Sequence, residues 1–142
     1  MNLVLDASMT LAWQFKRVDP VEILIAERAL AELPSFQAIV PALWYSEVAN
    51  TLLRGERQGA ISPAQTAYFL GELAEMEIVT DEISPRARQS VVLDLARRSG
   101  LTAYDATYLE LVLRISGILA TFDRQLASAA RIAGARVFGD ES

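Results

Sequence analysis

Cysteine and histidine are both absent from the sequence. Without cysteine the chain can form neither disulfides nor thiolate metal sites, and it has no thiol nucleophile. Without histidine it lacks the side chain that most often serves as a general acid or base near neutral pH. Ser-His-Asp triads and histidine-bearing zinc sites are therefore excluded. For a hydrolase of this composition, the leading route is a water activated by carboxylate-bound Mg²⁺ or Mn²⁺.

Long apolar runs and lysine are also scarce. No window approaches the roughly 18 consecutive apolar residues of a membrane span, and no basic segment followed by an apolar one opens the chain. We therefore expect a cytoplasmic protein that is not associated with a membrane. The net charge of −5 argues against a nonspecific nucleic-acid binder. Twelve of the 13 basic residues are arginine, which favours phosphate binding, although genomic base composition gives the same bias.

Short apolar segments alternate with amphipathic ones along the 142 residues, of which 52% are hydrophobic. This alternation predicts a three-layer α/β domain in which helices flank a mostly parallel central sheet of short strands. The single domain is expected over residues 1–138, with a loose C-terminal tail at 139–142. We predict strands at 3–5, 38–40, 77–80, 118–121 and 135–138, and helices at 7–15, 19–33, 41–54, 63–75, 85–99, 102–116 and 123–133.

Four acidic residues occupy comparable places in this pattern. Asp6 and Asp123 follow strands that should be neighbours, while Glu47 and Asp105 line or begin helices that leave the same edge of the sheet. Open α/β folds build their sites at this edge. Because clustered carboxylates repel one another unless a cation compensates, the pattern predicts one or two divalent metal ions. The hydroxyls of Ser8 and Thr121 are close enough in sequence to orient waters or bind the carboxylates.

Each of these acids also has an ordinary structural reading. Asp6 and Asp123 could cap the helices that they precede, and Asp105 could complete a capping box with Thr102. Glu47 belongs to a polar stripe that includes Asn50, Thr51 and Arg54, on a helix that is otherwise apolar nearly all round. We expect the rest of that helix to be buried. The stripe suits the wall of a metal cleft, and a solvated face is the alternative.

Four motifs follow one another along the chain: V-L-D-A-S, S-E-V-A-N-T-L, L-T-A-Y-D-A-T-Y-L-E-L and L-A-T-F-D-R-Q-L. In this order and spacing the chain resembles the PIN-domain ribonucleases, specifically the VapC toxins of bacterial and archaeal toxin–antitoxin pairs. The resemblance covers nearly the whole chain. It implies a catalytic site of Asp6, Glu47, Asp105 and Asp123, in which Asp6 and Asp105 bind Mg²⁺ (or Mn²⁺) directly. Thr121 and Asn50 match supporting polar positions of the family.

The same resemblance implies an endoribonuclease that hydrolyses RNA phosphodiester bonds with a Mg²⁺-activated water. It also implies a VapB-type antitoxin that covers the site, and a homodimer. Our candidates for RNA or antitoxin contacts are Arg54, Arg57, Arg97, Arg98 and Arg124, whose alternative is an ordinary charged surface. The aromatic residues near the motifs, Tyr108 among them, are expected in the core or at dimer contacts.

Two rival functions deserve comparison. An aspartyl-phosphate phosphatase or phosphoacceptor domain also places an aspartate after its first strand. The phosphatases need a second aspartate where this chain has Ser8, and both classes need a late lysine, whereas Lys16 is the only lysine. A non-catalytic PIN-fold scaffold, whose acids serve only as caps, is the second rival. Metal binding that depends on Asp6 and Asp105 separates the scaffold from the nuclease.

Overall fold

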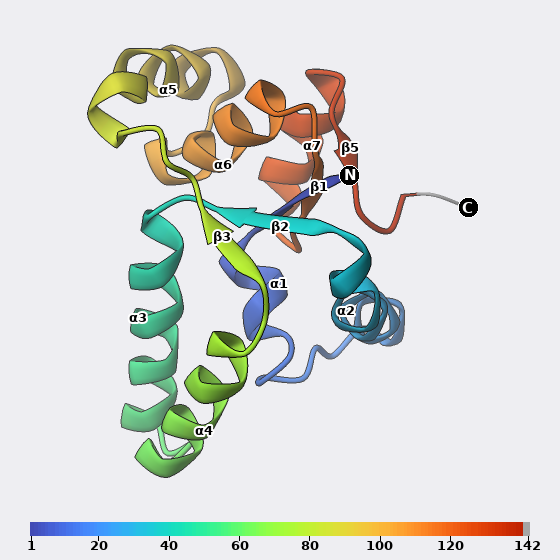
Figure 1. Ribbon diagram of the computed structural model, residues 1–142, viewed down its shortest axis with the longest axis vertical. Helices are drawn as coiled ribbons and strands as arrows, with labels where there is room; N and C mark the ends of the chain where they lie inside the picture. Colours follow the sequence, from blue (N-terminus) through green and yellow to red (C-terminus); the bar gives the residue numbers. More distant parts are fainter. Residues whose placement is uncertain (141–142) are drawn as a thin grey trace.

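A computed structural model describes residues 1–140 as a five-stranded parallel sheet with helices on both faces (Figure 1). The strand order is β3-β2-β1-β4-β5, and every neighbouring pair is parallel. This arrangement confirms the predicted three-layer α/β class. The strands are β1 (Asn2–Leu5), β2 (Gln37–Val40), β3 (Ile78–Thr80), β4 (Ile118–Ala120) and β5 (Arg136–Val137).

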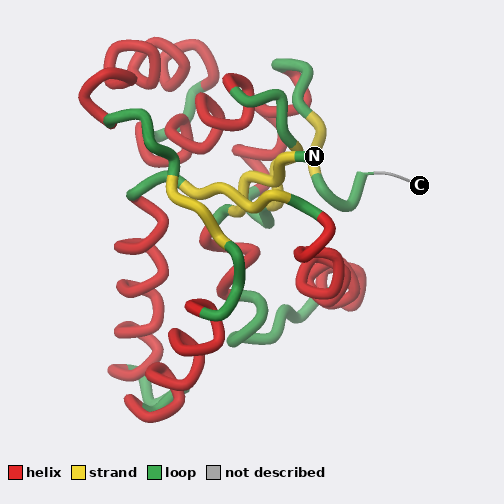
Figure 2. Tube along the Cα trace, in the orientation of Figure 1, coloured by secondary structure: helices red, strands yellow, loops and turns green. Residues whose placement is uncertain are grey.

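The helices make up most of the chain, as Figure 2 shows by colour. Figure 1 shows α1 to α4 on one side of the sheet and α5 to α7 on the other. A single 3₁₀ turn, Leu33–Ser35, leads from α2 into β2. The helices are α1 (Ala7–Leu11), α2 (Pro20–Glu32), α3 (Leu43–Arg57), α4 (Pro63–Ala74), α5 (Pro85–Ser99), α6 (Ala103–Arg114) and α7 (Arg124–Ile132).

Helix starts follow the local signals in the sequence. Ser62 and Ser84 cap α4 and α5, and each is followed by proline at the first helical position. At α4 the side chain of Gln65 also bonds back to the Ser62 backbone, which completes a capping box. Gly100 ends α5 in the left-handed conformation, at φ 65°, which glycine adopts without steric cost.

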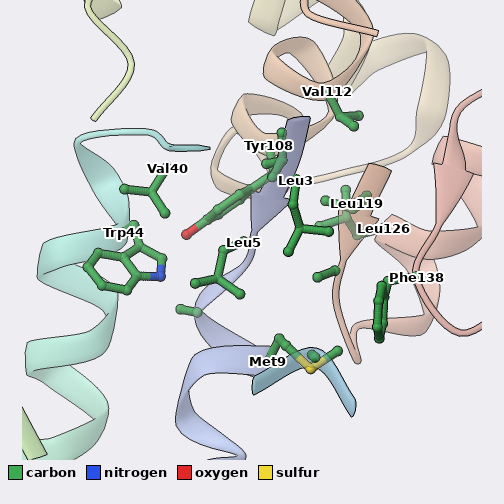
Figure 3. Close-up of a cluster of buried hydrophobic side chains, with 14 of the residues drawn as sticks. Leu3, Leu5, Met9, Val40, Trp44, Tyr108, Val112, Leu119, Leu126 and Phe138 are labelled. Atoms are coloured by element: carbon green, nitrogen blue, oxygen red, sulfur yellow. The ribbon is translucent and has the colours of Figure 1, made fainter. Parts of the chain in front are cut away.

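The centre of the core is β1, whose Leu3, Val4 and Leu5 have no exposed surface. A strand buried on both faces reads as a continuous apolar run, which is why this segment was predictable. Figure 3 shows Leu3 and Leu5 packed near Tyr108 of α6 and Leu119 of β4. The helix that carries Asp105 is therefore anchored directly on the strand that leads to Asp6.

Two predictions about helices were wrong. The first helix ends at Leu11, not at Phe15, and turns follow it. Trp13, in these turns, packs against the core and donates its indole N–H to the carbonyl of Ala26 at 3.0 Å. On α3 the expected burial of all apolar residues fails, since Tyr45 is 49% and Leu53 41% exposed. Figure 1 shows α3 running away from the sheet, so the sheet covers only part of the surface of this helix.

The predicted tail begins at Gly139, which adopts φ 99° and lies against the side chain of Ile25. Next to it, the carboxylate of Asp140 accepts two hydrogen bonds from the guanidinium of Arg131, at 2.6 and 2.8 Å. Residues 141–142 of that tail lie outside the described part of the chain. None of the described helices is both long enough and apolar enough to cross a membrane.

Candidate active site

The candidate site lies where β1 and β4 end side by side. Leu5 pairs with Ala120 at this edge, and the backbone N–H of Asp6 donates to the carbonyl of Ala120 at 3.0 Å. The chain passes from β1 to β2 and β3 on one side of the sheet, and places β4 and β5 on the other. Such a switch in direction opens a crevice at the carboxyl ends of the strands. Asp6 follows β1 directly, and Asp123 follows β4 after two residues.

Asp6 is buried and held by two hydroxyls. Ser8 Oγ and Thr121 Oγ1 both donate to Asp6 Oδ2 at 2.6 Å. These hydroxyls in turn accept backbone N–H groups, Ser8 from Phe122 at 2.9 Å and Thr121 from Asp123 at 3.0 Å. The Asp6 side chain makes no capping bond to α1, so the capping reading does not account for it.

Glu47 is held by a residue of a helix on the other side of the sheet. Tyr108 Oη, on α6, donates to Glu47 Oε1, on α3, at 2.6 Å. In Figure 3 the Tyr108 ring passes beside Leu5, with its hydroxyl directed toward Trp44 and α3. The bond therefore links the two helices across the end of the central strand, and it fixes one oxygen of the Glu47 carboxylate.

The structure distinguishes the helix-capping roles of Asp105 and Asp123: the Asp105 side chain caps no helix, whereas the Asp123 side chain does. Thr102 caps α6 by accepting the backbone N–H of Asp105 at 3.1 Å, but the Asp105 carboxylate does not bond to the backbone N–H of Thr102, so the cap is not a capping box. Asp123 caps α7, because its Oδ1 accepts the N–H of Leu126 at 2.8 Å. Capping does not remove Asp123 from the site, since it lines the same cleft as the other three acids.

All four acids line one open cleft of about 500 Å³. Burial raises the pKa of Asp6 above its ordinary range, against the effect of its two hydroxyl partners, and the nearby Asp123 adds to the rise. Burial, followed by the charges of Asp123 and Asp6, raises the pKa of Asp105 to about 6. Burial and the charges of Asp6 and Asp105 also raise the pKa of Glu47. The four carboxylates thus form one electrostatically coupled group.

Comparison with known proteins places this chain in a family. The family model for the PIN domain matches residues 3–132. The chain belongs to the PIN-domain family. A curated relative, Ribonuclease VapC3 of Pyrobaculum aerophilum, is 33% identical over 127 residues, which are 89% of this chain and 93% of that protein. The resemblance to the PIN-domain VapC proteins that the four motifs indicated is therefore confirmed.

Solved structures support the same fold. The structure of PAE2754 from Pyrobaculum aerophilum aligns with a TM-score of 0.73 at 23% identity, covering 97% of this chain and 90% of that one. The structure of FitAcB from Neisseria gonorrhoeae aligns with a TM-score of 0.57 at 18% identity, covering 96% of each chain. At these identities the likeness shows a shared fold.

The donor set of the PIN cleft fits a hard divalent cation, because Mg²⁺ and Mn²⁺ prefer carboxylate oxygens. Among residues 1–140 no three acidic side chains already have the spacing of a formed metal site. The pKa values of Asp6, Asp105 and Glu47 are raised first by burial and then by the neighbouring carboxylates, and a cation in the cleft would offset both effects. The hydroxyls of Ser8 and Thr121 both donate to Asp6 Oδ2. Neither hydroxyl occupies Asp6 Oδ1, the oxygen that could bind a metal ion.

Other predicted site residues of the PIN domain are dispersed. Asn50 is exposed on α3 and does not line the cleft, whereas Arg54 does. Arg98 and Arg124 line a separate hollow of about 420 Å³ at α5 and α7, where Arg98 also pairs with Asp94 at 3.0 Å. Arg57 and Arg97 are exposed and line neither the cleft nor this hollow.

Sequence reasoning missed two residues of the cleft region. Tyr108 was expected only as a core or dimer residue, yet it is both buried and bonded to Glu47. Its position three residues after Asp105, on the same side of α6, was the available signal. Arg17 lines the cleft as well, tied to Glu22 at 3.2 Å. No local pattern marks Arg17, because the turns after α1 bring it there.

Proposed function

We propose that this PIN domain is a metal-dependent endoribonuclease, the toxin of a VapBC-like toxin–antitoxin pair. One observation carries the proposal: four acids from separate segments of the chain line a single cleft at the switch point of a parallel sheet. A relative that spans nearly the same length is named a ribonuclease and a VapC protein. The absence of histidine leaves carboxylates and a divalent ion as the source of hydrolytic chemistry.

In this proposal Asp6 and Asp105 bind Mg²⁺ or Mn²⁺ directly, with Glu47 and Asp123 beside them. When bound, the ion lowers the pKa of a water molecule and stabilises negative charge on the phosphate. The protein supplies the orientation of the ligands. Ser8 and Thr121 hold Asp6, the cap at α7 holds Asp123, and α6 is seated on β1 so that Asp105 faces the cleft.

The partners in this proposal are RNA, a VapB-type antitoxin and a second copy of the chain, in the cytoplasm. Support for a protein partner comes from the outer side of α3 and α4, where large apolar side chains are exposed. They are Tyr45 (49%), Leu53 (41%), Tyr68 (71%) and Leu70 (44%). Sedimentation of the purified chain, alone and with an antitoxin encoded beside it, tests the homodimer and the complex.

The decisive experiment maps new RNA 5′ ends in cells briefly induced to express the chain, beside cells expressing Asp105→Asn. We expect discrete ends in the first sample and none of them in the second. The purified protein should cut the same RNA with Mn²⁺ and stop when the metal is chelated. Identical maps, with both proteins folded, would instead favour the non-catalytic scaffold.

A further inference from the structure

The cleft continues beyond the four acids along α3. Thr51, Arg54 and Gln58 of this helix line it together with Glu47. Seven residues separate Glu47 from Arg54, so at 1.5 Å per residue their backbones lie about 10 Å apart along the helix axis. Figure 1 shows α3 running away from the sheet in this direction. The cleft therefore has an acidic end at the sheet and a second arm that follows α3.

Next to α3, part of the lining of this arm is apolar. Leu11, Ala12 and Phe15, from α1 and the turns after it, line it. Phe15 packs closely on α3 because Gly55 has no side chain: a Cβ there would lie 2.8 Å from Phe15 Cζ and 3.0 Å from Ile61 Cγ2. An aromatic and aliphatic surface of this kind is one against which a nucleic-acid base can lie.

The charge of the arm is opposite to that of the acidic end. Arg54 is exposed and forms no ion pair with any acidic side chain among residues 1–140. Arg17 lines the same cleft, where it pairs with Glu22 at 3.2 Å and its guanidinium lies 4.7 Å from the centre of the Phe122 ring. Apart from the four acids of the site, no acidic side chain in the described part of the chain lines this cleft.

We propose that this second arm is a subsite for the unpaired RNA nucleotide next to the scissile phosphate. Arg54 and Arg17 bind the phosphate of that nucleotide, and the wall of Leu11 and Phe15 receives its base. The guanidinium fork suits phosphate oxygens, and a cleft of about 500 Å³ has the size of a small-ligand site, which a single nucleotide can occupy. This inference rests on the proposed endonuclease function of the acids.

The test measures RNA binding as a function of salt. A fluorescein-labelled single-stranded oligoribonucleotide is titrated with protein carrying Asp105→Asn, so that it is bound without being cut. Arg54→Ala, added to this background, should weaken binding and reduce the slope of log affinity against log salt by about 0.7, the value of one lost phosphate contact on a single strand. Arg54→Lys should restore the slope, since it restores the charge.

Arg57→Ala is the matched control, because Arg57 is exposed on the same helix but does not line the cleft. It should leave the slope unchanged. Mn²⁺ affinity and thermal unfolding, measured in proteins that keep Asp105, should be the same for Arg54→Ala and the wild type, which excludes an effect through the acids or the fold.

Equal slopes for the Arg54 and Arg57 variants would overturn the subsite while leaving the proposed function intact. If Arg54→Ala weakens only the binding of an antitoxin, the arm is a protein site and the inference is wrong. If the parent protein neither binds the oligonucleotide nor, with Asp105 restored, cuts RNA with Mn²⁺, the proposed function fails and the subsite fails with it.

Discussion

Tyr108 donates its hydroxyl to Glu47 at 2.6 Å, across the gap between α6 and α3. The tyrosine is fully buried, whereas the glutamate is half-exposed at the cleft. A buried donor that binds one carboxylate oxygen restricts how the other oxygen can turn. Partners of this kind, which orient a metal ligand without touching the metal, typically change metal affinity or activity by 10–100-fold when removed.

Tyr108→Phe should therefore lower Mn²⁺ affinity by about tenfold while the chain stays folded, because only the hydroxyl is lost. Electron paramagnetic resonance of free Mn²⁺ measures this affinity. Tyr104→Phe is the control, since Tyr104 is on the same helix but 63% exposed. In a Glu47→Gln background the effect of Tyr108→Phe should largely disappear. An equal loss in both backgrounds would contradict the positioning role.

Metal affinity should rise with pH through the region near 6. Protons compete with the ion for Asp105, whose pKa is raised to about 6, and for Asp6 and Glu47, whose pKa values are also raised. Mn²⁺ titrations on either side of pH 6 measure this change. Asp105→Asn should bind more weakly and with a shallower pH dependence. A flat profile in the wild type would mean that these carboxylates do not hold the ion.

The metal-free protein should become less stable as pH rises from about 4 to about 6. Folding raises the pKa of Asp105 from 3.8 to about 6, so its charged form is disfavoured in the folded chain. At neutral pH, Asp105→Asn should thus stabilise the metal-free fold. After allowance for solvent screening we expect about 1 kcal/mol, or roughly 3 °C in Tm. Scanning calorimetry in a chelator measures it, and Mg²⁺ should raise the Tm of the wild type but not that of the variant.

Thr121→Val should destabilise the fold by about 1–3 kcal/mol, because it leaves the buried Asp6 carboxylate short of a hydrogen bond. The same change should raise the pKa of Asp6 further and move metal binding to higher pH. Urea unfolding gives the free energy. Thr107→Val serves as the control, since the Thr107 hydroxyl bonds only the Ala103 carbonyl of its own helix. Equal losses of unfolding free energy in the two variants would show that the bond from Thr121 to Asp6 contributes no more than an ordinary helix hydroxyl.

The parts of the site that follow from local sequence were predictable. Asp6 comes directly after an apolar run that predicts a buried strand, Asp123 follows another after two residues, and parallel neighbours bring such ends together. Contacts between helices were not predictable in this way. The bond from Tyr108 to Glu47 and the exposure of Leu53 depend on where α3 and α6 lie relative to the sheet, which no local pattern encodes.

The order of the acids along the chain determines when the cleft can form during synthesis on the ribosome. Asp6, Glu47 and Asp105 leave the ribosome before Asp123, and β1 at the centre of the sheet gains its second neighbour only when β4 has emerged. A nascent chain therefore has no complete cleft during most of its synthesis. If the finished protein cuts RNA as proposed, a chain still being synthesised lacks the site for that reaction until β4 and Asp123 have emerged.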